Sequence, residues 1–234
     1  MALDQGTKDD GDNSVGRVWT LDPIDGTKGF LRQGQFAVCL ALMDNGVPVL
    51  SVMGCPNLPL SPAIINGERG VLFVAVKGHG SWQRALSKPV DDGAAWTRIF
   101  VHTVTDPANA ILCESVEAAH SAHESVTQMA TEIGIVRPSL RLDSQCKYAL
   151  VARGEATLYV RLPTDASYVE KIWDHVPGWL LVKEAGGQVT DAHGKPLNFV
   201  HGHTLKGNAG IIASNSIFHG RAQLAITSVL LGSI

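Results

Sequence analysis

The distribution of hydrophobic residues predicts a hairpin early in the chain. Apolar residues dominate positions 36–43 (FAVCLALM) and 47–54 (VPVLSVMG), and the turn sequence Asp-Asn-Gly separates the two runs. Asn-Gly favours the tight turn of a hairpin, so the two runs are predicted to be paired strands. Because apolar residues fall on both faces of each run, we expect both faces of this sheet to be covered.

The pattern changes after a second hairpin. This hairpin is predicted near Asn66 and Gly67, with a buried strand at 70–76 and its partner at 80–85. The polar stretch 91–96 then interrupts the apolar runs, and a boundary between two lobes is predicted there. We therefore expect a polar lead-in over residues 1–16, a first lobe over 17–95 and a second lobe over 96–234.

Strand and helix patterns alternate in the second lobe. Strands are expected at 111–115, 139–143, 156–162 and 210–214, and helices at about 122–133, 146–153, 174–185 and 217–230. This order predicts an α/β fold in which sheet layers are covered by helices. Ligands in such folds collect at strand ends, where Ser144, Arg161 and Asp174 are expected to lie.

Composition and net charge argue against some classes of function. The chain has 234 residues, of which 45% are hydrophobic, so it can bury a sizeable core. Its net charge of −3 argues against a nucleic-acid or membrane-surface partner, but is compatible with a small anionic ligand. The four cysteines show no zinc-binding spacing, the first residues lack the charged and apolar regions typical of a signal peptide, and there is no run of about 18 apolar residues. We therefore expect a cytoplasmic protein.

The stretch WTLDPIDGTKGF, residues 19–30, carries the clearest candidate chemistry. Val18 to Ile24 is predicted to be a short buried strand whose ladder ends at Pro23, which lacks an amide hydrogen. Asp22 and Asp25 around this proline can face one point, where a divalent cation would remove their repulsion. Hard oxygen ligands favour Mg²⁺. The alternative is an ordinary turn, because Asp-Pro and Asp-Gly pairs are common turn sequences.

Small residues follow the two aspartates directly. Gly26, Thr27 and Gly29 allow the backbone to approach an anion closely, with free amide hydrogens directed at it. A cation site and a phosphate site would then be adjacent.

A second element, KIWDHVPGWLLVKEAGGQVTD at 171–191, is predicted to be an amphipathic helix leading into a strand. Asp174 is expected at the helix cap and Gly186 just past the helix end. Pro177 would then lie in the first turn, where the missing amide hydrogen is tolerated.

Together these stretches resemble the inositol monophosphatase superfamily of Mg²⁺-dependent, lithium-sensitive phosphatases. Within it, the block KYALVARGEATLYVRLP, starting at Lys147, is similar to the 3'(2'),5'-bisphosphate nucleotidases of fungal type. The matching segments occur in the same order as in the family, from about residue 17 to the C-terminus. It implies a sugar-phosphatase fold of alternating helix and sheet layers, without the N-terminal helices of the first lobe.

The resemblance also implies roles for individual residues. Asp22, Asp25, Asp174 and the carbonyl of Ile24 match metal ligands. Thr27, with Asp25, matches the group that activates the attacking water, and Thr27 also cradles the phosphate with Gly26. The positions that match the nucleotide pocket are His120, Ser144, Lys147 and Arg161, with Tyr168 as a weaker match.

Several of these residues have simpler interpretations. His120 suits a surface position beside a helix, Lys147 suits a solvated lysine, and Arg161 suits a strand-end arginine in water. Lys147 at a helix start is unfavourable unless an anion is bound, which favours the phosphate interpretation. Glu170 and its neighbours are expected only to shape the loop before the helix at 174–185.

The resemblance implies hydrolysis of 3'-phosphoadenosine 5'-phosphate, and of its sulfated relative, in sulfur assimilation and salt tolerance. The family's metal-binding glutamate and water-orienting aspartate lie upstream of DPIDGT, in a segment that this sequence does not contain. The acids at 4, 9, 10 and 12 are expected to form a solvated tail rather than to replace them. The alternatives are therefore a catalytically weak nucleotide- and metal-binding fragment, or an inositol polyphosphate 1-phosphatase.

Overall fold

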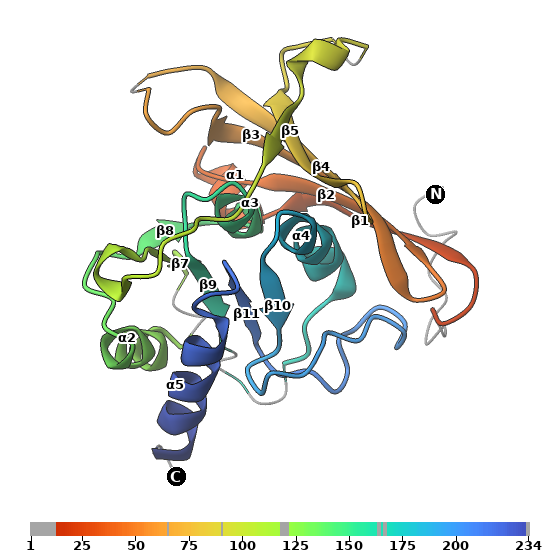
Figure 1. The fold of residues 1–234 in the computed structure, drawn as a ribbon. Helices are drawn as coiled ribbons and strands as arrows, with labels where there is room; N and C mark the ends of the chain where they lie inside the picture. Colours follow the sequence, from red (N-terminus) through yellow and green to blue (C-terminus); the bar gives the residue numbers. More distant parts are fainter. Residues whose placement is uncertain are drawn as a thin grey trace.

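The computed structural model describes residues 13–64, 66–89, 91–117, 122–162, 165 and 168–232. Its layers alternate between sheet and helix (Figure 1). The first layer is an antiparallel sheet in the order β1 (Arg17–Asp25), β2 (Ala37–Asp44), β3 (Val47–Pro59), β4 (Arg69–Val76), β5 (Gly80–Ala85) and β6 (Thr97–Ile99).

The second sheet is mixed. Its strand order is β10 (Gln188–Thr190), β11 (Ile211–Ser214), β9 (Leu158–Arg161), β7 (Leu112–Ser115) and β8 (Leu140–Leu142). Strand β7 is parallel to both of its neighbours, whereas β11 is antiparallel to β9 and β10. The alternating layers predicted from the sequence are confirmed.

Helices fill the space between the sheets and cover the second one. Helices α3 (Cys146–Ala152) and α4 (Ile172–Glu184) lie between the two sheets (Figure 1). Helices α2 (His123–Glu132) and α5 (His219–Gly232) pack against the other face of the second sheet. A short helix, α1 (Thr27–Leu31), follows β1, and two 3₁₀ turns span Gly93–Ala95 and Pro107–Asn109.

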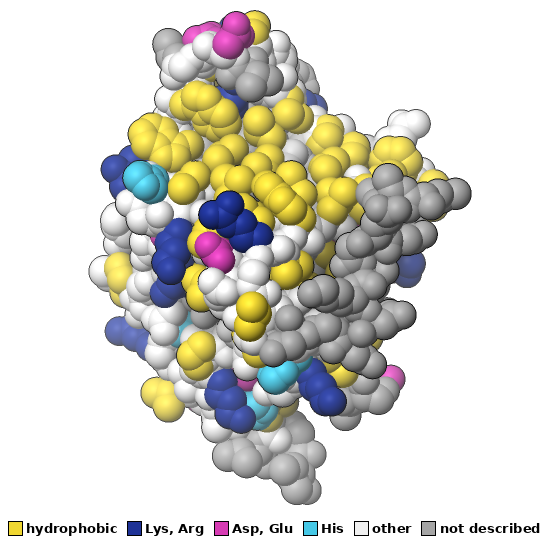
Figure 2. All heavy atoms as spheres, turned by 90° about the vertical axis from the view of Figure 1, so that its right-hand side faces the viewer, with side chains coloured by type: hydrophobic (Ala, Val, Ile, Leu, Met, Phe, Trp, Pro, Cys, Tyr) yellow, Lys and Arg dark blue, Asp and Glu magenta, His cyan; other side chains and the backbone are white. Residues whose placement is uncertain are grey.

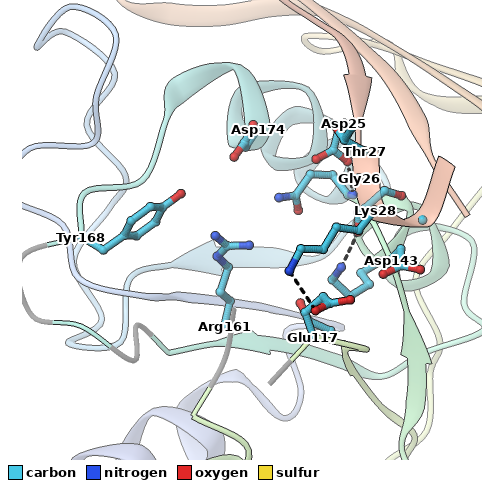
Figure 3. Close-up of a pocket in the computed structure, with 14 residues that line it drawn as sticks. Asp25, Gly26, Thr27, Lys28, Glu117, Asp143, Arg161, Tyr168 and Asp174 are labelled. Atoms are coloured by element: carbon cyan, nitrogen blue, oxygen red, sulfur yellow. Dashed lines mark hydrogen bonds and ion pairs between the residues drawn. The ribbon is translucent and has the colours of Figure 1, made fainter. Parts of the chain in front are cut away.

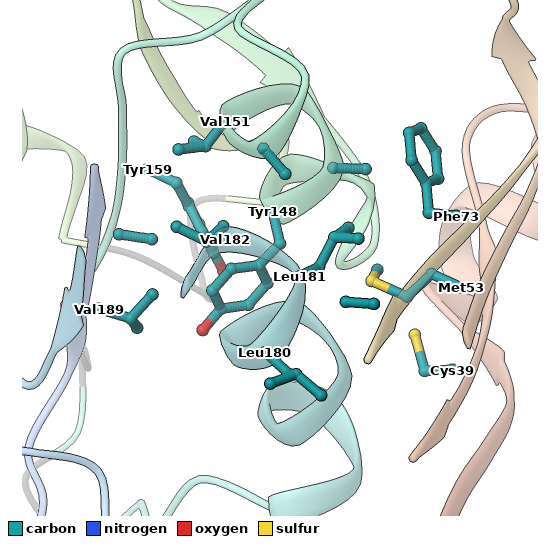
Figure 4. Packing of buried hydrophobic residues seen from close by; sticks show 14 of the residues in the cluster. Cys39, Met53, Phe73, Tyr148, Val151, Tyr159, Leu180, Leu181, Val182 and Val189 are labelled. Atoms are coloured by element: carbon teal, nitrogen blue, oxygen red, sulfur yellow. The ribbon is translucent and has the colours of Figure 1, made fainter. Parts of the chain in front are cut away.

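The main hydrophobic core surrounds α4 (Figure 4). Leu180 and Leu181 of α4 are almost fully buried, as are Met53 and Phe73 of the first sheet. Tyr148 of α3 is fully buried and contacts Tyr159 edge-on, with 5.0 Å between ring centroids. Because α4 contacts both sheets, the position of its first turn is fixed relative to the strand ends of both.

Helix α4 begins two residues earlier than predicted. Asp174 therefore lies in its first turn rather than at the cap or a strand end, and Pro177 lies inside the helix. The proline removes the amide that would have bonded to the carbonyl of Trp173. The hydroxyl of Ser51 on β3 donates to the Pro177 carbonyl at 2.7 Å, so buried packing holds this helix in place. The predicted stop is confirmed, with Gly186 at a φ of 91° after the last turn.

The turn of the first hairpin is confirmed, because Asn45 and Gly46 both have positive φ values of 51° and 75°. The prediction that both sheet faces are covered is wrong for the described residues. Helix α4 covers the inner face, whereas the outer face is apolar but half-buried or exposed. Figure 2 shows a broad band of hydrophobic side chains on the molecular surface. Cross-strand pairing gives the outer-face set as Trp19, Leu21, Val38, Leu40, Leu42, Leu50, Val52, Val74 and Val76.

Strand β1 is likewise more exposed than predicted. It lies at the edge of the sheet, and the side chain of Trp19 is 55% exposed. An apolar sequence with small polar interruptions suits an edge strand as well as a buried one, so hydrophobicity alone did not separate the two.

The four cysteines, Cys39, Cys55, Cys113 and Cys146, are buried and unpaired. Burial raises the pKa of the Cys113 thiol to about 12, so this thiol stays protonated at neutral pH. Among the helices that the structure describes, none has the length and apolar character needed to cross a membrane.

Candidate metal and phosphate site

A bulge at the end of β1 positions the first two aspartates of the site. Asp22 pairs with Cys39 of β2 and Asp25 pairs with Ala37, so β1 has one extra residue between the two pairs. We predicted that Pro23 would end the ladder, but the ladder resumes at Asp25. The bulge, rather than a strand end, redirects the two carboxylates.

The first turn of α4 supplies the third carboxylate. One oxygen each of Asp22, Asp25 and Asp174 lies within 4.8 Å of the others. The helix N-terminus carries partial positive charge, which favours a carboxylate at this position. The structure therefore brings together the three side chains that the sequence analysis named as metal ligands. We call them the aspartate cluster.

The negative charge of the aspartate cluster is not fully compensated by its surroundings. Burial raises the pKa of Asp25 to about 6, and the Gln145 amide and the Lys147 charge oppose this only in part. Burial, followed by the charge of Asp25, raises the pKa of Asp174 to about 8. Burial also raises the pKa of Asp22. A divalent cation would remove this repulsion, and carboxylates are hard oxygen ligands, so the residues present fit a metal site.

Gly26 and Thr27 lie directly beside the aspartate cluster. Gly26 has a φ of 80°, and a Cβ atom there would lie 2.7 Å from the Cβ of Ser144. The backbone of Ser144 also has a left-handed conformation, with a φ of 66°. Only glycine permits this close approach. The Thr27 hydroxyl donates to the carbonyl of Ile24 at 3.3 Å. A carbonyl oxygen has two lone pairs, so the Ile24 carbonyl retains one for a metal ion.

The turn between β8 and α3 contributes Ser144 and Lys147. The side chain of Asp25 accepts a hydrogen bond from the Gln145 amide, which joins this turn to β1. Lys147 is 2% exposed, and its ammonium donates to the carbonyls of Leu142 and Ser144. The interpretation of Lys147 as a solvated lysine is therefore wrong. These carbonyls, rather than an anion alone, stabilise its charge at the helix start.

Arg161 at the end of β9 is 9% exposed, so its interpretation as a strand-end arginine in water is also wrong. Its Nε donates to Glu170 at 2.6 Å, and its Cζ lies 5.9 Å from the ring centroid of Tyr168. His120, the remaining residue of the expected nucleotide pocket, lies outside the described residues.

Glu170 has a structural role that the sequence analysis missed. Its other carboxylate oxygen contacts Nε2 of His175 at 3.0 Å, and Nδ1 of His175 contacts the Tyr148 hydroxyl at 2.9 Å. Burial lowers the pKa of His175, so its neutral ring donates to Glu170 and accepts from Tyr148. Burial alone would raise the pKa of Glu170, but His175 and Arg161 outweigh it and lower this pKa to about 2. The spacing Arg161-x₈-Glu170-x₄-His175 matches no helix or strand period, so the sequence could not indicate this series of hydrogen bonds.

Asp25, Asp174 and Arg161 line one cavity of about 240 Å³. Figure 3 shows Asp25 and Asp174 on one side of it and Arg161 on the other, with Tyr168 beside Arg161. Lys147 also lines the cavity. The same cavity is thus lined by carboxylates and by two cationic side chains.

Residues that form ion pairs line part of the cavity. Glu117 pairs with Lys28 at 3.1 Å and with Arg32 at 2.6 Å, and Arg32 also pairs with Asp143 at 2.7 Å. These contacts connect α1 to the loops that follow β7 and β8. They add mixed charge to the cavity wall, which suits a small charged ligand better than an apolar one.

The raised pKa values predict how stability depends on pH without metal. Between the ordinary aspartate value of 3.8 and about 8, the folded protein binds the Asp174 proton more tightly than the unfolded chain does. Stability from this group therefore falls as pH rises. We expect an Asp174→Asn variant to melt at progressively higher temperature than the metal-free wild type as pH increases toward 8. The buried histidines are present in both proteins, so their contribution cancels in the difference between the two melting temperatures. A difference that stays constant with pH would contradict the prediction.

Comparison with known proteins agrees with this geometry. The family model described as the inositol monophosphatase family matches residues 3–230. A protein named 3'(2'),5'-bisphosphate nucleotidase from Emericella nidulans is 46% identical over 228 residues, which cover 92% of this chain. One of the same name from Schizosaccharomyces pombe is 46% identical over 232 residues and 97% of this chain. The chain spans 64% of the length of each of these relatives.

Solved structures show the same fold. An IMPase from Thermotoga maritima superposes with a TM-score of 0.67 at 23% identity, covering 92% of this chain and 70% of the other. An inositol monophosphatase from Anabaena gives a TM-score of 0.62 at 22% identity, covering 93% and 74%. The family model extends over nearly the whole chain, and the clustered aspartates lie within it. The chain therefore belongs to the inositol monophosphatase family.

Proposed function

We propose that this chain carries the site of a Mg²⁺-dependent phosphatase that removes the 3'-phosphate of 3'-phosphoadenosine 5'-phosphate, giving AMP and phosphate. The observation that carries the proposal is that one cavity is lined both by carboxylates of the aspartate cluster and by two cationic side chains. The aspartate cluster suits a cation that binds the scissile phosphate, and Arg161 with Lys147 suits a second phosphate. The names of the nucleotidases that it resembles support the same substrate class.

Each group in the cavity has a defined part in this proposal. Mg²⁺ would neutralise charge on the phosphate and lower the pKa of the attacking water. Asp22, Asp25, Asp174 and the Ile24 carbonyl would hold it. Gly26 and Thr27 would cradle the scissile phosphate, and the Thr27 hydroxyl, beside Asp25, would orient the water. The remainder of the nucleotide would contact His120, Ser144, Lys147 and Arg161.

The cellular setting belongs to the same proposal. The sulfated relative of the substrate carries the same 3'-phosphate, so the groups that bind the scissile phosphate would serve both. A role in sulfur assimilation and salt tolerance, and a cytoplasmic location, follow from the resemblance. The four unpaired cysteines are compatible with a reducing compartment.

Replacement of Arg161 tests the substrate class. Arg161→Ala removes a charged hydrogen-bond donor worth about 1.5–3 kcal/mol, or about 10- to 100-fold in affinity. We expect this loss for the nucleotide bisphosphate and only a small change for an inositol monophosphate, which has no second phosphate. Binding and phosphate release would be measured for both ligands, together with the melting temperature.

Arg141→Ala is the matched control, because Arg141 also donates its Nε to a buried glutamate but does not line this cavity. Equal losses for both ligands in the Arg161 variant would contradict the assignment of Arg161 to the second phosphate.

A further inference from the structure

Arg161 lies within electrostatic reach of two groups of carboxylates. Its Nε donates to Glu170, and it lines the same cavity as Asp25 and Asp174. Figure 3 shows the guanidinium extending into the cavity, with Asp174 across from it. A flexible arginine at this position would pair with the aspartate cluster, because bidentate pairs between guanidinium and carboxylate are strong where water is scarce.

Buried contacts prevent that movement. Glu170 is 4% exposed and binds Arg161 through one oxygen and His175 through the other. His175 is fully buried and is held in turn by the hydroxyl of Tyr148. The Glu170 carboxylate is therefore fixed at both oxygens, and it fixes the Nε edge of Arg161. The terminal amines of Arg161 remain directed into the cavity.

We propose that Glu170 is a positioning residue that holds Arg161 away from the aspartate cluster and so keeps this cluster available to a cation. The same contact presents the terminal amines of Arg161 to the second anionic group of the ligand. This inference rests on the proposed function only in taking the aspartate cluster to be a cation site. It explains why a buried glutamate accompanies Arg161 in a cavity that is already acidic.

Cation binding without substrate tests the inference. We would measure Mg²⁺ and Mn²⁺ binding by calorimetry for the wild type, Glu170→Ala and the double variant Glu170→Ala with Arg161→Ala. In the single variant the released guanidinium competes with the cation, so we expect Kd to rise by about tenfold or more. In the double variant no competitor remains, so cation affinity is expected to return to the wild-type value or exceed it.

The melting temperature of every variant is measured alongside cation binding, because removing both members of a buried ion pair can also restore stability. Recovery of cation affinity supports positioning where the single variant is folded at the temperature of the measurement. Glu170→Gln fills the same volume, and it decides the question if the alanine variant does not fold. Its amide oxygen can still accept from Arg161 but its charge is lost, so cation binding is expected to weaken less than in the alanine variant, and adding Arg161→Ala is expected to restore it.

Glu114→Ala is the matched control. Glu114 is also buried and also binds an arginine Nε, of Arg141 at 2.9 Å, and a histidine, His123 at 2.8 Å. Neither partner lines the cavity, so cation affinity should not change. Unchanged affinity in Glu170→Ala, or no recovery in the double variant, would overturn the inference while leaving the proposed function intact. Absence of cation binding by the wild type would overturn both.

Discussion

Asp174→Asn is expected to lower cation affinity and metal-dependent phosphate release by more than about 100-fold, because loss of residues that only support a ligand already costs about 10- to 100-fold. Asparagine keeps the shape of the side chain but removes the negative charge. The charge is the property that a cation requires, and because burial raises the pKa of Asp174 to about 8 without a cation, binding below this pH also displaces a proton.

The fold should survive this substitution. Because the surroundings raise the pKa of Asp174 to about 8, its charge is unfavourable in the metal-free fold, and removing that charge is expected to leave the variant at least as stable as the wild type at pH 8. Asp143→Asn is the control, because Asp143 also lines the cavity but already pairs with Arg32. Its cation affinity should stay within about twofold of the wild type, since exposed ion pairs contribute little. An Asp174→Asn variant that binds the cation normally would contradict the assignment of the aspartate cluster.

Gly178→Ala is expected to destabilise the protein by about 1–3 kcal/mol, although alanine is the better helix former by about 1 kcal/mol. A Cβ atom at Gly178 would overlap the ring of Tyr148 and lie 2.7 Å from its Cβ. The ring cannot move aside, because it is fully buried, packs on Tyr159 and binds His175 through its hydroxyl.

A second helical glycine provides the control. Gly220 lies in α5, where a Cβ atom would have no neighbour within 4 Å. Gly220→Ala is therefore expected to be neutral or stabilising by up to about 1 kcal/mol. Denaturant unfolding of both variants measures the two free energies. Similar effects at the two positions would show that helix propensity, and not the contact between α3 and α4, determines the outcome.

Local sequence patterns predicted much of this fold. The hairpin at Asn45 and Gly46, the glycine stop at Gly186 and the alternating strands and helices of the second half all depend on short-range preferences, and the structure confirms them. The predicted division at residue 96 remains a prediction, because core contacts around α4 include both sheets.

Features that depend on tertiary packing were predicted less well. The apolar strands β2 and β3 could not reveal which of their faces α4 would cover. The chemistry of the site shows the same limit. DPIDGT and Asp174 were identifiable by their residue types, but the burial of Lys147 and the chain from Glu170 through His175 to Tyr148 required the three-dimensional arrangement.

The most direct test of the central claim is phosphate release from 3'-phosphoadenosine 5'-phosphate by the purified chain, with the products separated and identified. We expect release that requires Mg²⁺, is inhibited by lithium, yields AMP, and does not continue from AMP itself. A folded chain that binds the nucleotide and Mg²⁺ but releases no phosphate would contradict the proposed activity and favour a binding fragment. Release from inositol polyphosphates alone would instead favour an inositol polyphosphate 1-phosphatase.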